Sequence, residues 1–431
     1  MRVFLGLSEI AGYYRGLHHS LREIGVDSVY GCGGHPFGYA DAGIDLQPWP
    51  VRLFQKVDGM RLRASRSSRF RRAIIKALHL FCRVPLLLWA LLKCDVFVFG
   101  FGSCFFMPRE LRLFRLLGKR TIHVFHGSDN RPRYMDGGVI QPEVLHDAAA
   151  VLRNHRQQHR RIKWIEKYSS CLVSHPATAQ YFQRPYVNWL LATGIPFTGE
   201  GIQIEGRESA PGSPVVILHC PSHPALKGTA YIRGMIGRLK AEGHLIDFRE
   251  IINRPNAEVL QELKNCDFVI DQAYADYPMA GFATEAAHFG KPAVVGGYAQ
   301  KICGEIEQAN GLVCDLYCLP EDMEGVIRRL ITDPEYRRQC GLKAKAFVES
   351  AWSRRTVAQN WLRLLKGEVP DEWFVRPEQT AYIHGCGLPE NGLKEGAAFF
   401  LRHGDGLKIL FLEHRPDLQA GVVALAGDLA A

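Results

Sequence analysis

Short apolar runs alternate with amphipathic helical patterns along most of this chain, and this alternation restricts its fold more than any other feature. Each run has the length of a strand and is separated from the next by a helix or a long loop. Strands connected in this way lie parallel in a sheet with helices on its faces, so an α/β fold is predicted. The expected strands are 1–6, 95–99, 121–125, 169–173, 215–219, 245–250, 267–271 and 292–296.

The length of the chain predicts two domains rather than one. At 431 residues it is too long for a single hydrophobic core. Residues 198–214 are rich in Gly, Ser, Glu and Pro and carry few apolar side chains, which is typical of a linker. We therefore expect a first domain over 1–197 and a second over 215–350.

Residues 370–431 are additional to this plan. Their pattern predicts a strand over 380–384, a helix over 389–402 and a second strand over 407–413. A small α/β appendage is the expected fold of this segment, and the sequence assigns it no function.

The cysteines and the apolar runs indicate a cytoplasmic protein without a metal site. Twelve cysteines are dispersed along the chain and none forms a Cys-x-x-Cys pair, so we expect reduced thiols and no zinc. Few apolar residues precede Glu9, which argues against a signal peptide. The longest apolar run, Val84–Leu92, has about half the length that a membrane span needs, so no span is expected.

Basic residues are concentrated in one segment of the first domain. The net charge of the chain is +9, and between Val51 and Arg83 ten basic residues accompany one acid. Apolar residues and Trp89 follow, and a basic segment beside an apolar one can rest on anionic lipid, with about 1 kcal/mol from each basic group. Contact between 51–92 and an anionic membrane surface is one interpretation; a solvated loop followed by a core helix is the other. No nucleic-acid motif accompanies the charges, so nucleic acid is not an expected partner.

The strand at 215–219 breaks into a small polar loop that ends at Lys227, and a helix follows at once. Such a loop presents a fixed cation and free backbone N–H groups to a phosphate. A buried lysine beside a helix N-terminus can neutralise a phosphate group without a metal. Taken alone, Lys227-Gly228-Thr229 fits equally well a surface lysine before an ordinary helix.

A second pattern lies downstream, where Asp267–Asp271 is followed by 281–287, Gly-Phe-Ala-Thr-Glu-Ala-Ala, and by Gly290-Lys291-Pro292. Together with the loop at 215–229, it resembles the nucleotide-sugar half of retaining glycosyltransferases of the GT-B fold (glycosyl transferases group 1, family 4-like). The resemblance covers residues 1 to about 367.

The resemblance implies two Rossmann-like domains that face each other across a cleft. It also implies that the end of the long helical pattern over 334–365 crosses back to the first domain, near Ala351-Trp352-Ser353. The crossing-back helix is expected over 351–369.

In the family a glutamate at the start of a helix accepts hydrogen bonds from both ribose hydroxyls, and Glu285 matches it. The alternative is a glutamate favoured by the positive end of the helix dipole. Asp271, at the tip of the preceding strand, fits either a sugar contact or bracing of the loop. The residues that the resemblance places at the donor are Gly12, Ser222, His223, Lys227, Gly228, Asp271, Gly281, Phe282 and Glu285.

Four positions depart from the family pattern, one of which is Ala280, at the place of the usual glycine, so that Gly281 is one residue closer to Glu285. Ser222 stands where the family has an arginine, with His223 beside it, and Tyr277 stands where the first glutamate of Glu-x7-Glu is usual. Ala11 replaces one of two adjacent glycines, so only Gly12 remains. If the pocket binds a diphosphate, His223 or backbone amides must replace the arginine.

Two further candidates follow the strand at 121–125 in the first domain. His126 matches the place of a histidine near the reacting sugar, where it can bind the sugar or assist deprotonation of the acceptor. A structural role is the alternative for this histidine. Asp129 fits either a contact to the acceptor or an ion pair with Arg131 or Arg133. We take His126, Asp129 and Lys227 as the catalytic candidates.

The resemblance implies a metal-independent glycosyltransferase that takes a nucleotide-diphosphate sugar as co-substrate and needs no other cofactor. A glycan, a lipid-linked or a polysaccharide acceptor would approach from the first domain, at the cytoplasmic face of a bacterial membrane. Two other functions stay open at this stage. One is a nucleotide-sugar epimerase on the same plan, and the other is a sugar- or nucleotide-binding membrane-associated protein that has lost catalysis.

Overall fold

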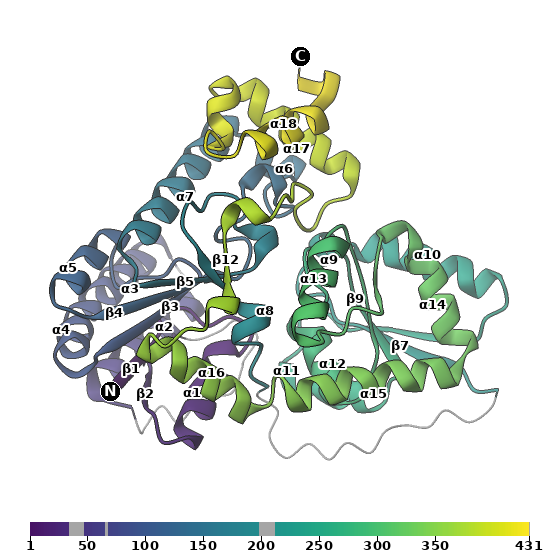
Figure 1. Cartoon of the computed structure of the whole chain (residues 1–431), viewed down its shortest axis with the longest axis horizontal. Coiled ribbons are helices and arrows are strands. Elements are labelled where there is room, and N and C mark those ends of the chain that lie inside the picture. The colour runs from purple at the N-terminus through teal and green to yellow at the C-terminus, as the bar shows by residue number, and fades with distance from the viewer. Residues whose placement is uncertain (34–46, 65–67, 198–211, 431) are drawn as a thin grey trace.

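The computed structural model describes residues 1–33, 47–64, 68–197 and 212–430, and two separate, mainly parallel sheets organise them. The first sheet has the strand order β12-β6-β5-β4-β3-β1-β2, and the second has the order β11-β10-β9-β7-β8. Figure 1 shows the two α/β domains side by side, each with helices packed against its sheet. The predicted α/β fold with two Rossmann-like domains is confirmed. The predicted linker, 198–214, lies almost entirely outside the described residues, so the domain limits stay a prediction.

Each predicted strand of the two domains has a counterpart in the structure. The first sheet consists of β1 (Arg2–Leu5), β2 (Asp27–Tyr30), β3 (Val96–Gly100), β4 (Arg120–Val124), β5 (Cys171–Ser174), β6 (Tyr186–Asn188) and β12 (Phe374–Val375). The second consists of β7 (Val215–His219), β8 (Ile246–Glu250), β9 (Phe268–Ala275), β10 (Ala293–Gly297) and β11 (Tyr317–Cys318). The sequence analysis missed β2, β6, β11 and β12, and it ended β9 before Ala275.

The long helix predicted over 334–365 is two helices, α15 (Pro334–Ser350) and α16 (Arg354–Lys366). The first helix ends at Ser350, and Ser353 caps the start of the second, because its hydroxyl accepts a hydrogen bond from the backbone N–H of Thr356. Helix α16 packs against α1 (Tyr13–Glu23), and Arg354 forms an ion pair with Glu23 at 3.1 Å. The crossing-back helix is therefore confirmed.

The two strands predicted in the appendage are wrong. Residues 380–384 are irregular, and 406–410 form a 3-10 turn, so the described part of the appendage after β12 is helical. Its main helices are α17 (Glu390–His403) and α18 (Pro416–Ala426), which lie above the first domain in Figure 1. β12 is the terminal strand of the first sheet, and no described residue after it adds a further strand to that sheet. The apolar side chains of Ile409 and Leu410 are instead buried.

The basic, apolar segment of the first domain forms three helices: α2 (Trp49–Arg63), α3 (Arg69–Phe81) and α4 (Arg83–Lys93). Only Cys82 separates α3 from α4. Within the described ranges, the stretch Arg69–Lys93 is long and apolar enough to cross a bilayer by length and composition. The sequence analysis expected no membrane span because it considered only the apolar run Val84–Leu92. It did not include the apolar residues of α3, which extend this stretch.

Candidate functional site

Lys227 lies at the boundary of the two domains, held by the second sheet. It ends the short helix α9 (Pro224–Lys227), and α10 (Thr229–Ala241) begins directly after Gly228. Gly228 has φ +69°, and a Cβ there would lie 2.7 Å from the Cβ of Ala273. Only glycine allows this sharp turn between the helices so close to β9.

Asp271 braces this lysine. The Nζ atom of Lys227 lies 2.9 Å from Oδ1 of Asp271, whose side chain is 1% exposed. Of the two roles that the sequence left open for Asp271, the structure favours bracing for this oxygen. The other oxygen, Oδ2, is buried and has no hydrogen-bond partner in the described parts of the chain.

Ser222 and His223 are exposed on the loop just before α9. They stand close in sequence to Lys227, as the phosphate hypothesis requires, but the structure gives neither a role of its own. Their contact with a diphosphate stays a prediction.

Glu285 lies on α12 (Gly281–His288), the helix that follows β9. Its Oε1 atom accepts a hydrogen bond from Nδ2 of Asn256 at 2.8 Å. Burial raises the pKa of Glu285 to about 7, and the negative charge of nearby Asp271 adds to the rise. A carboxyl group with this pKa is poised between two protonation states at neutral pH.

Phe282 and Gly281 have different surroundings on the same helix. Phe282 packs against the apolar core of the second domain, which favours a structural role. A Cβ at Gly281 would lie 3.9 Å from the Cβ of Ala11 in the first domain. The loop of Gly12, which begins α1 with φ +78°, therefore lies across the domain boundary from α12.

The raised pKa of Glu285 predicts a pH dependence of stability. Its ordinary value is 4.5, so between pH 4.5 and about 7 the folded chain holds a proton that the unfolded chain has lost. The contribution of the protonated Glu285 to the free energy of unfolding is therefore fully present below pH 4.5. It is lost as the pH rises to about 7. We expect Glu285→Gln to reduce the fall in melting temperature between pH 5 and pH 7.5. An unchanged fall in the variant would contradict the assignment.

His126 follows β4 and is held by the start of α1. Its Nε2 atom lies 2.8 Å from the hydroxyl of Tyr14, and its ring makes an edge contact with Tyr13. Burial lowers the pKa of His126 to about 4 and raises the pKa of Tyr14 well above its ordinary value. The neutral hydroxyl then donates to Nε2, so the ring hydrogen is assigned to Nδ1. A neutral donor suits contact with a sugar better than deprotonation of an acceptor at pH 7.

Asp129 lies beneath the loop of His126. Its Oδ1 atom accepts hydrogen bonds from the backbone N–H groups of His126 at 2.9 Å and Gly127 at 3.0 Å. Burial raises its pKa to about 6. Of the alternatives left open for Asp129, an ion pair with Arg131 or Arg133 is not formed among the described residues, and the guanidinium of Arg131 pairs with Asp276. In the structure Asp129 shapes the loop, and its catalytic role stays a prediction.

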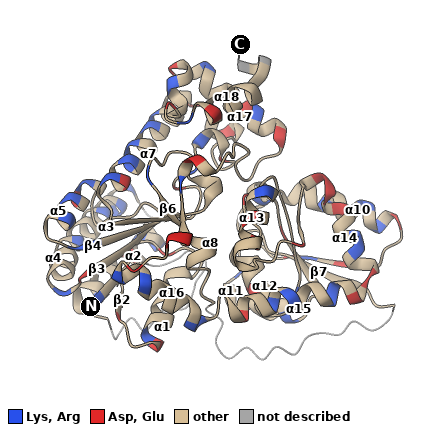
Figure 2. Ribbon diagram, viewed as in Figure 1, with Lys and Arg blue, Asp and Glu red and all other residues tan. Residues whose placement is uncertain are grey.

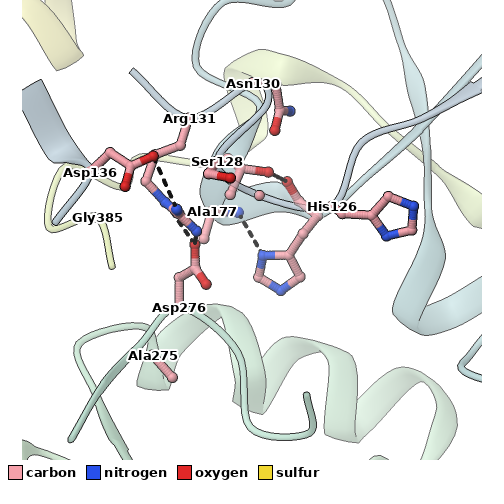
Figure 3. A network of polar contacts seen from close by, with 12 residues as sticks. His126, Ser128, Asn130, Arg131, Asp136, Ala177, Ala275, Asp276 and Gly385 are labelled. Carbon is pink, nitrogen blue, oxygen red and sulfur yellow. Dashed lines mark hydrogen bonds and ion pairs between the residues drawn. The ribbon is translucent and has the colours of Figure 1, made fainter. Parts of the chain in front are cut away.

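The sequence analysis missed a buried ion pair between the domains. Nε of Arg131 donates to Oδ2 of Asp276 at 3.1 Å, Nη2 contacts the same oxygen, and Asp136 lies 3.8 Å from Nη1 (Figure 3). Arg131 follows β4 and Asp276 follows β9, so the loops at the carboxyl ends of both sheets meet here. No local signal pairs residues that are 145 positions apart.

The appendage also reaches this boundary. The carbonyl of Cys386 accepts a hydrogen bond from the N–H of Gly137 at 2.9 Å, and the N–H of Gly387 donates to the carbonyl of Tyr274 at 2.8 Å. Gly385 and Gly387 have φ of +69° and +77°, which lets the turn fit between the two domains. One short turn of the appendage therefore contacts both domains beside Arg131.

Several buried polar atoms at the boundary lack hydrogen-bond partners among the described residues. They are Oδ2 of Asp271, Oδ1 of Asp276, Nε2 of His175 and Oγ1 of Thr284. His175 was not among the predicted residues; its ring lies 5.1 Å from that of Tyr277, which belongs to the second domain. Buried polar groups are almost always paired, so these atoms mark where a polar ligand can be bound.

No family model matches the chain, and no curated protein matches it. Several solved structures are similar at low identity. Anabaena Alr3699/HepE in complex with UDP and glucose is 13% identical over 85% of this chain and 99% of that chain, with a TM-score of 0.47. The glycosyltransferase SnogD from Streptomyces nogalater is 14% identical over 85% and 99%, with a TM-score of 0.41. S. aureus MnaA with UDP is 10% identical over 85% and 96%, with a TM-score of 0.42.

Proposed function

We propose that this chain transfers a sugar from a nucleotide-diphosphate donor to a glycan or lipid-linked acceptor, with retention of configuration and without a metal. The observation that carries the proposal is the placement of Lys227. It ends a short helix at the domain boundary, 2.9 Å from a buried aspartate, and the N-terminus of α10 follows it. Transfer from a nucleotide sugar requires neutralisation of the departing diphosphate, and a lysine held in this way supports that role.

The lysine can bind Asp271 and a diphosphate at once. An ammonium group has three N–H donors, and Asp271 accepts from one of them through Oδ1. The other two can donate to phosphate oxygens. Asp271 restricts the lysine side chain before the donor binds. The side chain therefore loses little conformational entropy on binding. The backbone amides at the start of α10 would supply part of what the absent arginine supplies elsewhere.

Glu285 and His126 would hold the other parts of the donor. Asn256 binds one oxygen of Glu285, so the carboxyl group is oriented before a ribose binds. His126 lies in the first domain and is neutral, so its Nδ1–H can donate to the sugar. The unpartnered oxygen of Asp276 is a further acceptor for a sugar hydroxyl.

The exposed face of α3 and α4 supports contact with an anionic bilayer at the cytoplasmic face of a membrane. The buried residues of the stretch recur every three or four positions: Ile75, His79, Cys82, Leu86 and Ala90. A second apolar series with the same spacing is exposed: Phe70, Ile74, Leu78, Phe81, Val84, Leu88 and Leu92. Residues three or four apart share one face of a helix, so α3 and α4 rest on the protein by one face and expose apolar side chains on another.

Basic residues surround this apolar face. Figure 2 shows Lys and Arg on the side of the first domain that carries α3, α4 and α5 (Leu111–Leu116), away from the second domain. Arg69, Arg71 and Arg72 lie at the start of α3, where they can reach lipid phosphates while the apolar side chains enter the interface. A helix that keeps one face packed on its domain lies in the plane of the membrane rather than across it.

This interpretation predicts the effect of two exposed aromatic residues. Phe70 is 77% exposed and Phe81 is 72% exposed. Replacing both with serine removes apolar area that would otherwise be buried in lipid. We therefore expect the affinity of the protein for anionic vesicles to fall at least about tenfold. The measurement is co-sedimentation with vesicles of phosphatidylglycerol and phosphatidylcholine. Leu342→Ser, on the second domain, is the control, and equal binding by both variants would contradict the interpretation.

Nucleotide binding tests the proposed transfer first. A rise in melting temperature with UDP, GDP or ADP identifies the base, and the absence of any rise would exclude the transferase. A labelled sugar nucleotide of that base is then incubated with and without glycan and lipid-linked acceptors. Transfer to an acceptor supports the proposal, epimer formation without acceptor supports the epimerase, and binding without turnover on a broad panel supports a binding protein.

A further inference from the structure

A cavity of about 530 Å³ lies in the first domain, between α2, the start of α4 and the loops that follow β1 and β3. This volume is within the range of small-molecule sites. The cavity is at the carboxyl ends of β1 and β3, but none of the donor candidates lines it. Its lining includes Glu9, Phe54, Asp58, Arg61, Arg83 and Phe101.

Arg83 is the cationic group of this cavity that has no carboxylate partner. Its Nη1 atom donates to the carbonyl of Phe105 at 2.8 Å, and its guanidinium lies 5.9 Å from the centre of the Phe54 ring. Its Nε atom is buried without a hydrogen-bond partner, and within the described chain no carboxylate forms an ion pair with it. Partial burial of an unpaired cation is unfavourable, and an anion bound in the cavity would offset that cost.

The other charged groups of the cavity are already paired. Nε of Arg61 donates to Oδ1 of Asp58 at 2.7 Å, and the same oxygen lies 3.0 Å from Nε2 of His79. Glu9 accepts hydrogen bonds from three backbone N–H groups at the start of α1 and from the hydroxyl of Tyr30. Both acids are therefore already bound by groups of the protein. The guanidinium of Arg61 has further N–H donors besides the one that binds Asp58.

The rim of the cavity is apolar and leads toward α3 and α4. Phe101 and Phe106 line the cavity and are partly exposed, and Met107 is exposed beside them. Arg83 begins α4 and binds the loop after β3, so the cavity adjoins the helices that carry the exposed apolar series. A ligand that fits both parts has an anionic head and an apolar tail.

We propose that this cavity binds the phosphate-bearing head of a lipid-linked acceptor, with the phosphate on Arg61 and Arg83 and the lipid tail passing over Phe101 and Phe106 toward α3 and α4. The proposal rests on the proposed sugar transfer and names its acceptor class. Anionic lipid recruits the enzyme through α3 and α4, and the cavity then selects the lipid that carries the phosphate. The acceptor head at the carboxyl ends of β1 and β3 would lie on the His126 side of the domain boundary.

Binding of simple amphiphiles tests the proposal. The probes are dodecyl phosphate below its micelle concentration, dodecanol and inorganic phosphate, titrated calorimetrically into the full chain. We expect dodecyl phosphate to bind at least tenfold more tightly than either of the others. Arg83→Gln and Arg61→Gln should each weaken it at least tenfold, whereas Arg63→Gln, an exposed position on α2 outside the cavity, should leave it unchanged.

Two controls separate this site from folding defects and from the donor site. Melting temperatures and the response to the nucleotide identify any variant that is misfolded, and a double Phe70→Ser, Phe81→Ser variant removes binding to the exposed helix face. Equal binding of dodecyl phosphate by the wild type and by folded Arg83→Gln would overturn the proposal. If inorganic phosphate binds as tightly as dodecyl phosphate, the proposal that the ligand carries a lipid tail is overturned. Because nucleotide binding is measured separately, its absence would refute the sugar transfer and leave the result for the cavity intact.

Discussion

Replacing Lys227 with methionine is expected to lower the rate of sugar transfer by a factor of roughly 100 to 1,000, the loss that follows removal of one fixed donor to a developing negative charge. The lysine stands at the domain boundary and is restricted by Asp271 before the donor binds. Methionine keeps much of the length of the side chain but cannot donate to a phosphate. The measurement is the rate of transfer from a labelled sugar nucleotide at saturating donor.

The partner of Lys227 must be controlled in this experiment. Asp271 is 1% exposed, and without the lysine its carboxylate would be buried next to no cation, which destabilises a fold by roughly 3–5 kcal/mol. The double variant Lys227→Met, Asp271→Asn removes both charges and should recover most of the melting temperature without recovering transfer. Lys240→Met, exposed on α10, should change neither. Full activity in a folded double variant would remove Lys227 from the reaction.

The parts of the site that could be predicted are those with a local signal. Lys227 was found because an apolar strand is followed by a polar loop and a helix within fifteen residues, 215–229. Glu285 was identified from the resemblance, because it matches the family's glutamate at the start of a helix. Both residues follow strands of a parallel sheet. The carboxyl ends of its neighbouring strands lie at one edge, which brings such residues together.

The parts that could not be predicted depend on contacts between distant residues. Arg131 and Asp276 are 145 positions apart, and the lowered pKa of His126 follows from burial beside α1. The predicted strands of the appendage failed for the same reason. Their alternating side chains suit a sheet, but whether a sheet edge is free is decided elsewhere in the chain.

The pair of Arg131 and Asp276 predicts the largest change in stability. Their side chains are 6% and 0% exposed, so Arg131→Met leaves a carboxylate buried between the domains without its cation. We expect a loss of roughly 3–5 kcal/mol in the free energy of unfolding, because the desolvation of Asp276 is no longer offset. The measurement is urea denaturation, with fluorescence and circular dichroism followed together because two domains need not unfold in one step.

Replacing both partners should be far less damaging than replacing one. In Arg131→Met, Asp276→Asn the carboxylate of Asp276 is removed, and only Asp136, 3.8 Å from Nη1 of Arg131 in the wild type, loses its cation, so much of the lost stability should return. Arg156→Met is the matched control, because Arg156 pairs with the exposed Asp405 and such pairs contribute roughly 0–1 kcal/mol. A double variant as unstable as Arg131→Met would contradict the ion pair as the cause. If the double variant is stable yet binds the nucleotide more weakly, the pair also sets how the two domains face each other, since neither Lys227 nor Glu285 has been changed.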